Sequence, residues 1–456
     1  MIEKKKLQTY IELAMASGAD FAEIFLEHTN NKLIRVMNGE VTSIDQGNIH
    51  GAGIRLIQGV DEVYGYLNEL SEDNITTLIK NLSASFNDEK KTVVPLGDPK
   101  PFKNNIEKPF NQQEVKAVTD KLIGYSNLMK AHDDRIVQAI SQMIQIEQKV
   151  WIANSKGIYQ DDVRNYIRVM LSAVAKEDQL MQSASEGPGR FMGYEIFDMI
   201  DFEKLAKETA ISAIKLLSAK DMMPQVMPVV LHNGFGGVIF HEACGHPLEA
   251  TSVAKGLSPF THKLGEKIGS DIVSAYDDGT IDNAWGKLNF DDEGMPTQKN
   301  LLIENGVLKG FLIDYRNGIK MGMNPTGSSR RQSYKFSPTS RMNSTYIAPG
   351  QDDFEQIIKD TKYGLFAKKL GGGTVVPATG EFNFVVQEGY MIEDGKLTDA
   401  VRGAMLIGQG KDVLFKIDRI ANNLELGQGM CGSISGSIPV DVGQPTLRVS
   451  SMQVGG

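Results

Sequence analysis

Side chains able to bind metal or transfer protons are most concentrated in the segment HEACGHPLE, where Glu242 follows His241 and His246 lies five residues beyond the first histidine. In the zinc-peptidase motif H-E-x-x-H, two histidines four apart share one helix face and the glutamate acts as general base. A spacing of five would separate the histidines by roughly 140° on a regular α-helix, which suits a shared metal poorly. Gly245 and Pro247 allow the last turn to widen or unwind. The sequence therefore predicts a metal site here if the helix is short and irregular.

A catalytic zinc ion usually takes three protein ligands and one water molecule, so the two histidines need a third partner. The candidates are His232, Cys244, Glu249, His262 and Cys431. Local spacing does not choose among them. Cys244 also has two other interpretations, as a small buried packing residue or as the nucleophile of a cysteine hydrolase.

The composition limits the classes of protein to be considered. The chain has 456 residues, a formal net charge of −9, two cysteines and seven histidines. Two cysteines cannot build a disulfide framework, and the acidic balance disfavours a nucleic-acid partner. The N-terminal segment carries Gln8, Thr9 and Glu12 where an export signal needs an apolar run, and the chain has no stretch of about 18 apolar residues. We therefore expect a cytoplasmic protein with no membrane partner.

Hydrophobic periodicity and turn residues predict the elements that must position these side chains. In the first half we expect helices over 73–84, 112–129 and 202–218 and strands over 21–26, 33–37, 41–44, 51–57, 63–67, 136–154 and 159–176. Asn38-Gly39, Asn305-Gly306 and Asp394-Gly395 are typical of tight hairpins. From residue 226 onward, glycines and hairpin turns dominate.

This change from mixed helix and strand patterns to glycine-rich hairpins predicts an α+β fold with two domains. Residues 1–222 would form an N-terminal α+β domain with an antiparallel sheet and helices. Residues 223–456 would form a β-rich, barrel- or sandwich-like C-terminal domain that carries the metal-site helix. We find no glycine motif typical of dinucleotide binding.

Two further polar groups allow more than one interpretation. The guanidinium groups of Arg330 and Arg331 could bind a carboxylate or carbonyls of a peptide substrate, or form structural ion pairs. The acidic runs 277–280 and 291–294 resemble fragments of calcium loops but lack the full ligand ladder. Turn chemistry, in which carboxylates accept backbone N–H groups, is the better interpretation.

Several motifs in the same order along almost the whole chain resemble the TldD branch of the TldD/PmbA metalloprotease family. They are SIDQGNIHG (43–51), HEACGHPLE (241–249), DDGT (277–280), DDEG (291–294), LIENGVLKG (302–310), RRQSY (330–334) and MCGSISGSIPVDVGQPTLRV (430–449).

The resemblance implies a function and a site. The metal ligands would be His241, His246 and Cys431, and Glu242 would be the catalytic general base acting on metal-activated water. The implied cofactor is one divalent metal ion, with zinc the best match for two histidines and a cysteine. The implied reaction is hydrolysis of unfolded or small peptides inside a dimer cavity, formed by two copies or with a PmbA/TldE-type subunit. Residues 1–222 would build this dimer and its chamber. The alternative is a non-catalytic peptide-binding subunit with a structural metal.

Overall fold

The structure, a computed structural model, describes residues 2–86, 88–102, 104–112, 114–376 and 379–455. The elements of the first part are α1 (Lys4–Met15), β1 (Phe21–Met37), β2 (Glu40–Gln58), β3 (Asp61–Leu67), α2 (Glu72–Ser83), η1 (Phe110–Gln112), α3 (Val115–Lys130), β4 (Ile136–Asn154), β5 (Tyr159–Glu177), β6 (Leu180–Glu186), β7 (Gly189–Arg190), α4 (Ile196–Met199) and α5 (Phe202–Leu217).

The strands of this part form one long antiparallel sheet in the order β3-β2-β1-β4-β5-β6, with β7 paired to β5. The predicted strands 21–26 and 33–37 are wrong as separate elements, because β1 runs unbroken through both. The polar residues between them stay extended since β1 pairs on both sides there, with Asn30 opposite Asn48 on β2 and Glu147 on β4. Backbone pairing to two neighbours outweighs the weak strand preference of these side chains.

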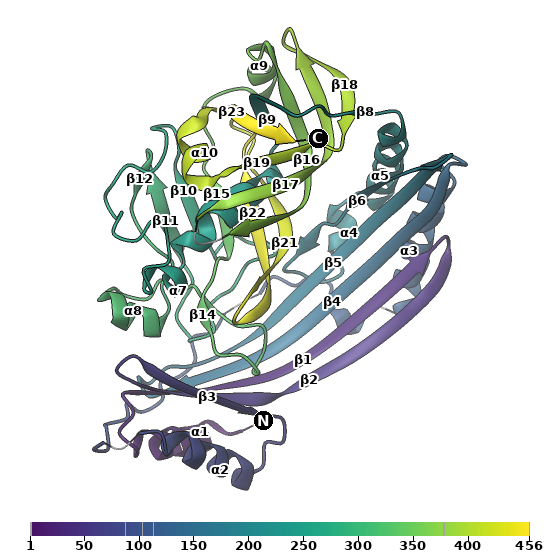
Figure 1. Cartoon of the computed structure of the whole chain (residues 1–456). Helices are drawn as coiled ribbons and strands as arrows, with labels where there is room; N and C mark the ends of the chain where they lie inside the picture. The colour runs from purple at the N-terminus through teal and green to yellow at the C-terminus, as the bar shows by residue number, and fades with distance from the viewer. Residues whose placement is uncertain (1, 87, 103, 113, 377–378, 456) are drawn as a thin grey trace.

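Four helices cover the two ends of this sheet (Figure 1). The helices α1 and α2 bury Leu7, Ile11 and Ile75 against one end of β1 and β2, and α3 and α5 pack a second apolar cluster against β4 and β5. The predicted helices 73–84, 112–129 and 202–218 correspond to α2, α3 and α5. Apolar periodicity located them because each helix buries one face against the sheet.

The second part contains β8 (Lys220–Asp221), β9 (Gln225–Leu231), η2 (Gly234–Gly237), α6 (Val238–Phe240), η3 (His241–Gly245), η4 (His246–Leu248), α7 (Ala250–Val253), β10 (Ala275–Asp278), β11 (Lys299–Glu304), β12 (Val307–Leu308), α8 (Tyr315–Met321), β13 (Ser329–Arg330), β14 (Thr339–Ser340), β15 (Ser344–Ile347), α9 (Phe354–Lys359), β16 (Tyr363–Val376), β17 (Glu381–Glu393), β18 (Lys396–Arg402), β19 (Met405–Gln409), α10 (Gly410–Lys416), β20 (Ile417–Ile420), β21 (Glu425–Ser433), β22 (Gly436–Gln444) and β23 (Leu447–Gly455).

These strands form two main sheets. One sheet has the order β12-β11-β10-β15-β22-β21. In the other, neighbouring strands pair in the order β16-β9-β23-β19-β17, and β16 also pairs with β17, which closes a barrel. Asn305 and Asp394 begin the tight turns β11–β12 and β17–β18 with positive φ angles of 50° and 48°. Asn38 likewise begins the β1–β2 turn with a φ angle of 51°. All three predicted hairpins are confirmed, and so is the α+β fold with a barrel in its β-rich second part.

The division at residue 222 stays a prediction. No helix in the described part of the chain is long and apolar enough to cross a membrane. In Figure 1, the barrel lies over the long sheet, and the β21–β22 hairpin of the six-stranded sheet points down toward the long sheet. Nη2 of Arg168 on β5 donates to the carbonyl of Gln428 on β21 at 3.1 Å.

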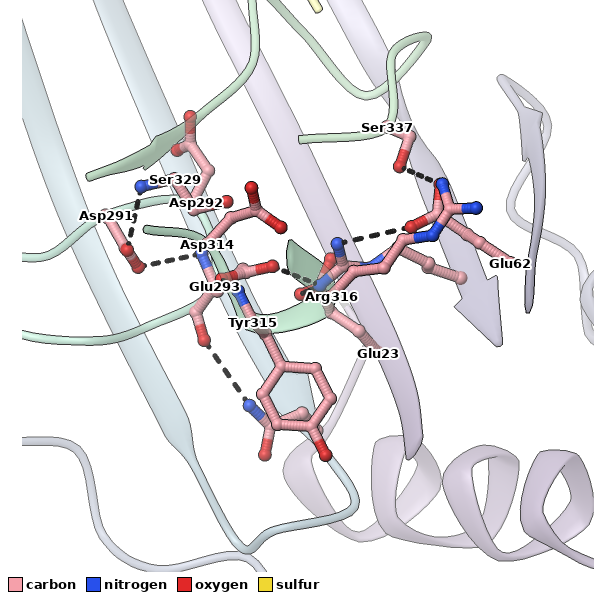
Figure 2. A network of polar contacts seen from close by, with 12 residues as sticks. Glu23, Glu62, Asp291, Asp292, Glu293, Asp314, Tyr315, Arg316, Ser329 and Ser337 are labelled. Carbon is pink, nitrogen blue, oxygen red and sulfur yellow. Dashed lines mark hydrogen bonds and ion pairs between the residues drawn. The ribbon is translucent and has the colours of Figure 1, made fainter. Parts of the chain in front are cut away.

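A buried ion network joins the long sheet to the second part of the chain (Figure 2). Arg55 Nη2 on β2 donates to Glu23 Oε2 at 3.0 Å and to Glu293 Oε1 at 2.7 Å. The other oxygen of Glu293 accepts the backbone N–H of Tyr315 at 2.9 Å. Because Glu23 and Arg55 are fully buried, their charges need these partners, and the network fixes how the two parts pack.

Candidate metal centre

The motif helix widens at its histidines. After the short α6, residues 241–245 form one π-helical turn, in which the backbone N–H of His246 donates to the carbonyl of His241, five residues earlier. Residues five apart lie above one another in such a turn, so the irregular helix expected from the sequence is confirmed. Gly245 leaves room for the side chain of Met342, since a Cβ there would lie 2.3 Å from Sδ of Met342 and would force that side chain to move.

Cys431 on β21 meets the two histidines although it lies 185 and 190 residues away in sequence. Its Sγ is 3.3 Å from Nε2 of His241 and 3.2 Å from Nε2 of His246. The donor atoms of the trio all lie within 4.8 Å of one another, and this is the group among the described residues that could hold a metal ion. Tetrahedral zinc would place sulfur and nitrogen ligands about 3.5 Å apart. Both sulfur–nitrogen distances of the trio are therefore close to those of a zinc site.

The charges of the trio favour the ligating form of the cysteine. Burial by itself would raise the pKa of the Cys431 thiol, but the charges and hydrogen bonds of His241 and His246 hold it at about 3. Burial would lower the pKa of His246, but Glu249 and Cys431 keep it well above its usual range. These shifts favour the Cys431 thiolate, the form that binds metal, beside a protonated His246 whose Nε2 proton a metal ion would displace.

Two glutamates lie on different sides of the His246 ring. Oε2 of Glu242 is 3.6 Å from Nε2, the nitrogen that faces Cys431, and its side chain is 28% exposed. Oε2 of Glu249 is 3.1 Å from Nδ1, and its side chain is 4% exposed. Glu242 is therefore placed beside the donor atoms at the accessible side. Glu249 contacts Nδ1 of His246, on the side of the ring opposite Nε2, and does not face the place where a shared metal would lie.

The remaining candidate ligands lie elsewhere. Cys244 is buried in the apolar cluster of the barrel, and burial raises the pKa of its thiol well above the usual range. Nδ1 of His232 is 3.1 Å from Oγ1 of Thr446, and its ring packs against Phe366. His262 is exposed. None of these three belongs to the metal-binding group found among the described residues.

Arg330 and Arg331 are buried against the chain's own groups. Nη1 of Arg330 donates to the carbonyl of Met342 at 2.7 Å. Nη2 of Arg331 pairs with Glu23 and donates to the carbonyl of Asp292 at 2.8 Å. Both residues are at most 3% exposed. These contacts favour structural pairing, the second of the two interpretations given above.

The acidic runs serve as turns. Asp278 Oδ1 accepts the backbone N–H of Thr280 at 2.8 Å, and Asp291 Oδ1 accepts the N–H groups of Glu293 and Met295, both at 3.0 Å. Carboxylates that accept backbone N–H groups in this way hold turns in place. The prediction of turn chemistry is confirmed for both runs.

Sequence reasoning missed Arg341. It is fully buried, and its Nη2 donates to the carbonyl of Cys431 at 2.5 Å. The residue stands in the segment SPTSRMNST, where no charge pattern or spacing marks it as part of a site. A lone arginine among small polar residues is the one available signal.

The fold and the trio define an α+β protein with a candidate metal centre, and comparison with known proteins gives its family. Models of the PmbA/TldA metallopeptidase domain 1, central domain and C-terminal domain match residues 22–85, 108–217 and 224–456. The "Metalloprotease TldD homolog" of Haemophilus influenzae is 34% identical over 100% of this chain and 97% of its own length. The chain belongs to the PmbA/TldD metallopeptidase family.

Two other proteins add to this picture. The "Zinc metalloprotease TldD homolog" of Saccharolobus solfataricus is 28% identical over 98% of this chain and 99% of its own length. The crystal structure of TldE from Thermococcus kodakarensis superposes with a TM-score of 0.78, covers 99% of this chain and 100% of its own, and is 18% identical. This second likeness shows the shared fold.

Proposed function

We propose that the chain is a zinc-dependent peptidase in which His241, His246 and Cys431 hold the metal. The proposal rests on these three donor atoms, which lie within 4.8 Å of one another. It also rests on the Glu242 carboxylate, which lies 3.6 Å from Nε2 of His246. A relative named as a zinc metalloprotease supports the choice of metal. A bound zinc ion would supply a Lewis acid that polarises a peptide carbonyl and lowers the pKa of water.

Glu242 is proposed as the general base. Its carboxylate lies beside the donor atoms on the accessible side, where it can accept a proton from an attacking water molecule. The same oxygen can then deliver the proton to the leaving amine. Oε2 of Glu249 accepts Nδ1–H of His246, which leaves the Nε2 lone pair directed at the metal position.

The proposed substrates are unfolded or small peptides. Family membership also supports an assembly in which the chain pairs with a second copy or with a PmbA/TldE-type subunit. We place the protein in the cytoplasm, as the sequence predicts. Arg330 and Arg331 are not needed for substrate in this proposal, since their donors are directed at the chain's own carbonyls and carboxylates.

Two alternatives have less support. A structural metal site would be closed by a fourth protein ligand, whereas three donors gather among the described residues. A cysteine hydrolase would need an accessible, acidic thiol, whereas Cys244 is buried among apolar side chains.

The test is metal analysis of the purified protein followed by cleavage of unstructured peptides of graded length. We expect close to one zinc per chain, loss of cleavage with a chelator and recovery when zinc is added back. Product masses will separate cleavage within the peptide from removal of terminal residues. Stoichiometric metal without turnover, alone and with a TldE-type partner, would favour the binding subunit instead.

A further inference from the structure

Behind the proposed ligands lies a second pair of charged groups, Glu249 and Arg341. Glu249 is 3% exposed and Arg341 is 0% exposed. Oε2 of Glu249 contacts Nδ1 of His246 at 3.1 Å. Oε1 of the same carboxylate lies 3.9 Å from Nε of Arg341.

Arg341 also holds the strand that carries the third proposed ligand. Its Nη2 donates to the carbonyl of Cys431 at 2.5 Å, and its Nη1 donates to Ser435 Oγ and to the carbonyl of Gly436, both at 2.9 Å. Ser435 and Gly436 lie at the turn of the β21–β22 hairpin, and Cys431 lies on β21 just before it. One guanidinium group thus spans the distance from the hairpin to the carboxylate behind His246.

We propose that Glu249 and Arg341 are a coupled pair of positioning residues, Glu249 fixing the tautomer and direction of His246 and Arg341 fixing Cys431 and Glu249 together. The inference rests on the proposed function, because it assumes that His246 and Cys431 hold the metal. Neither residue touches the position of the metal or the reacting atoms. Their effect is to keep two ligands from distant segments in one arrangement.

Two buried atoms without hydrogen-bond partners support the coupling. Among the described residues, Glu249 Oε1 and Arg341 Nε are both buried without a hydrogen-bond partner, and they lie 3.9 Å apart. A buried carboxylate and guanidinium are costly to leave unpaired, so each group requires the other. The two histidines also differ, because Nδ1 of His241 is buried with no partner among the described residues. Among the described residues, His246 is the one histidine of the pair whose Nδ1 contacts a carboxylate, so the proposed positioning acts on His246 and not on His241.

The test measures zinc affinity and the visible spectrum of the cobalt-substituted protein, which do not depend on catalysis. Removing a group behind a metal ligand typically weakens metal binding by about 10- to 100-fold. We expect this loss for Glu249→Ala, with altered cobalt d–d and thiolate charge-transfer bands. Glu249→Gln keeps an acceptor for Nδ1–H and should recover most of the affinity and the wild-type spectrum.

Glu195→Ala is the matched control. Glu195 is also a buried carboxylate, 5% exposed, but it accepts backbone N–H groups of Lys108 and Gly193 in the first part of the chain. We expect it to lower thermal stability and leave zinc affinity unchanged. Equal zinc loss in both alanine variants would overturn the proposal, since it would reflect general destabilisation. Wild-type affinity and an unchanged spectrum in Glu249→Ala would overturn it as well.

A double variant tests the coupling. Arg341→Lys keeps a positive charge but cannot reach the hairpin carbonyls and Glu249 together, and we expect it to weaken zinc binding about tenfold. If the pair is coupled, Glu249→Ala combined with Arg341→Lys loses less affinity than the product of the two single losses. If the double variant's loss of zinc affinity equals the product of the two single losses, the coupling is refuted. A wild-type protein that binds no metal would instead refute the metal centre itself.

Discussion

The substitution Glu242→Gln separates the proposed proton transfer from metal binding. The glutamine has nearly the same shape, and the side chain is 28% exposed, so the change should not disturb packing. The three proposed donor atoms belong to other residues, and we expect zinc affinity within about threefold of wild type. Loss of a positioned general base typically costs about 10²- to 10⁴-fold in rate, equivalent to about 3–5 kcal/mol of barrier.

The assay follows cleavage of an unstructured peptide by mass spectrometry, with zinc measured in the same samples. Glu208→Gln, an exposed change on α5, serves as the control and should match wild type. Activity within tenfold of wild type at equal zinc content would remove Glu242 from the mechanism. Loss of zinc in the variant would show that Glu242 acts in holding the metal, which the geometry does not predict.

Three further predictions concern the cysteines and a buried carboxylate. Cys431→Ser should bind zinc at least about 100-fold more weakly in a chelator competition, because a serine hydroxyl does not ionise as the thiol does; an unchanged zinc content would contradict the ligand set. Cys244 should resist alkylation in the native protein and react only after unfolding, because it is buried with a raised pKa; rapid labelling with loss of activity would favour a cysteine hydrolase. Burial raises the pKa of Asp277 from 3.8 to about 6, so the contribution of this carboxyl group to stability should fall as the pH rises through that interval. Relative to wild type, Asp277→Asn should gain up to about 3 kcal/mol in urea unfolding between pH 4 and pH 7, and a constant difference would refute the shift.

Local pattern was enough to predict part of the site. The spacing of His241 and His246 and the presence of Gly245 predicted an irregular helix, which is the π-helical turn. Asn-Gly and Asp-Gly pairs predicted hairpins because those residues accept positive φ angles. Such features depend on a few neighbouring residues, so a single sequence contains them.

Contacts between distant segments could not be predicted in this way. Local spacing left five candidates for the third ligand, and only the family resemblance pointed to Cys431. The role of Glu249 depends on which nitrogen of the His246 ring it faces, which no spacing determines. The continuity of β1 likewise depends on pairing with two strands, one of them more than 100 residues away.

The candidate metal centre depends on the long sheet as well as on the barrel. The segment from β13 to β14 binds the sheet at one end, where Arg331 pairs with Glu23 of β1. Just past its other end, Arg341 holds the carbonyl of Cys431. Leaving one partner of a buried ion pair without the other costs about 3–5 kcal/mol, a large share of the stability of a typical domain. Without the sheet, Arg331 would lose Glu23 and Glu293 would lose Arg55. Residues 223–456 alone would keep the contact of Arg341 with Cys431 but would lose the contacts that anchor the other end of this segment.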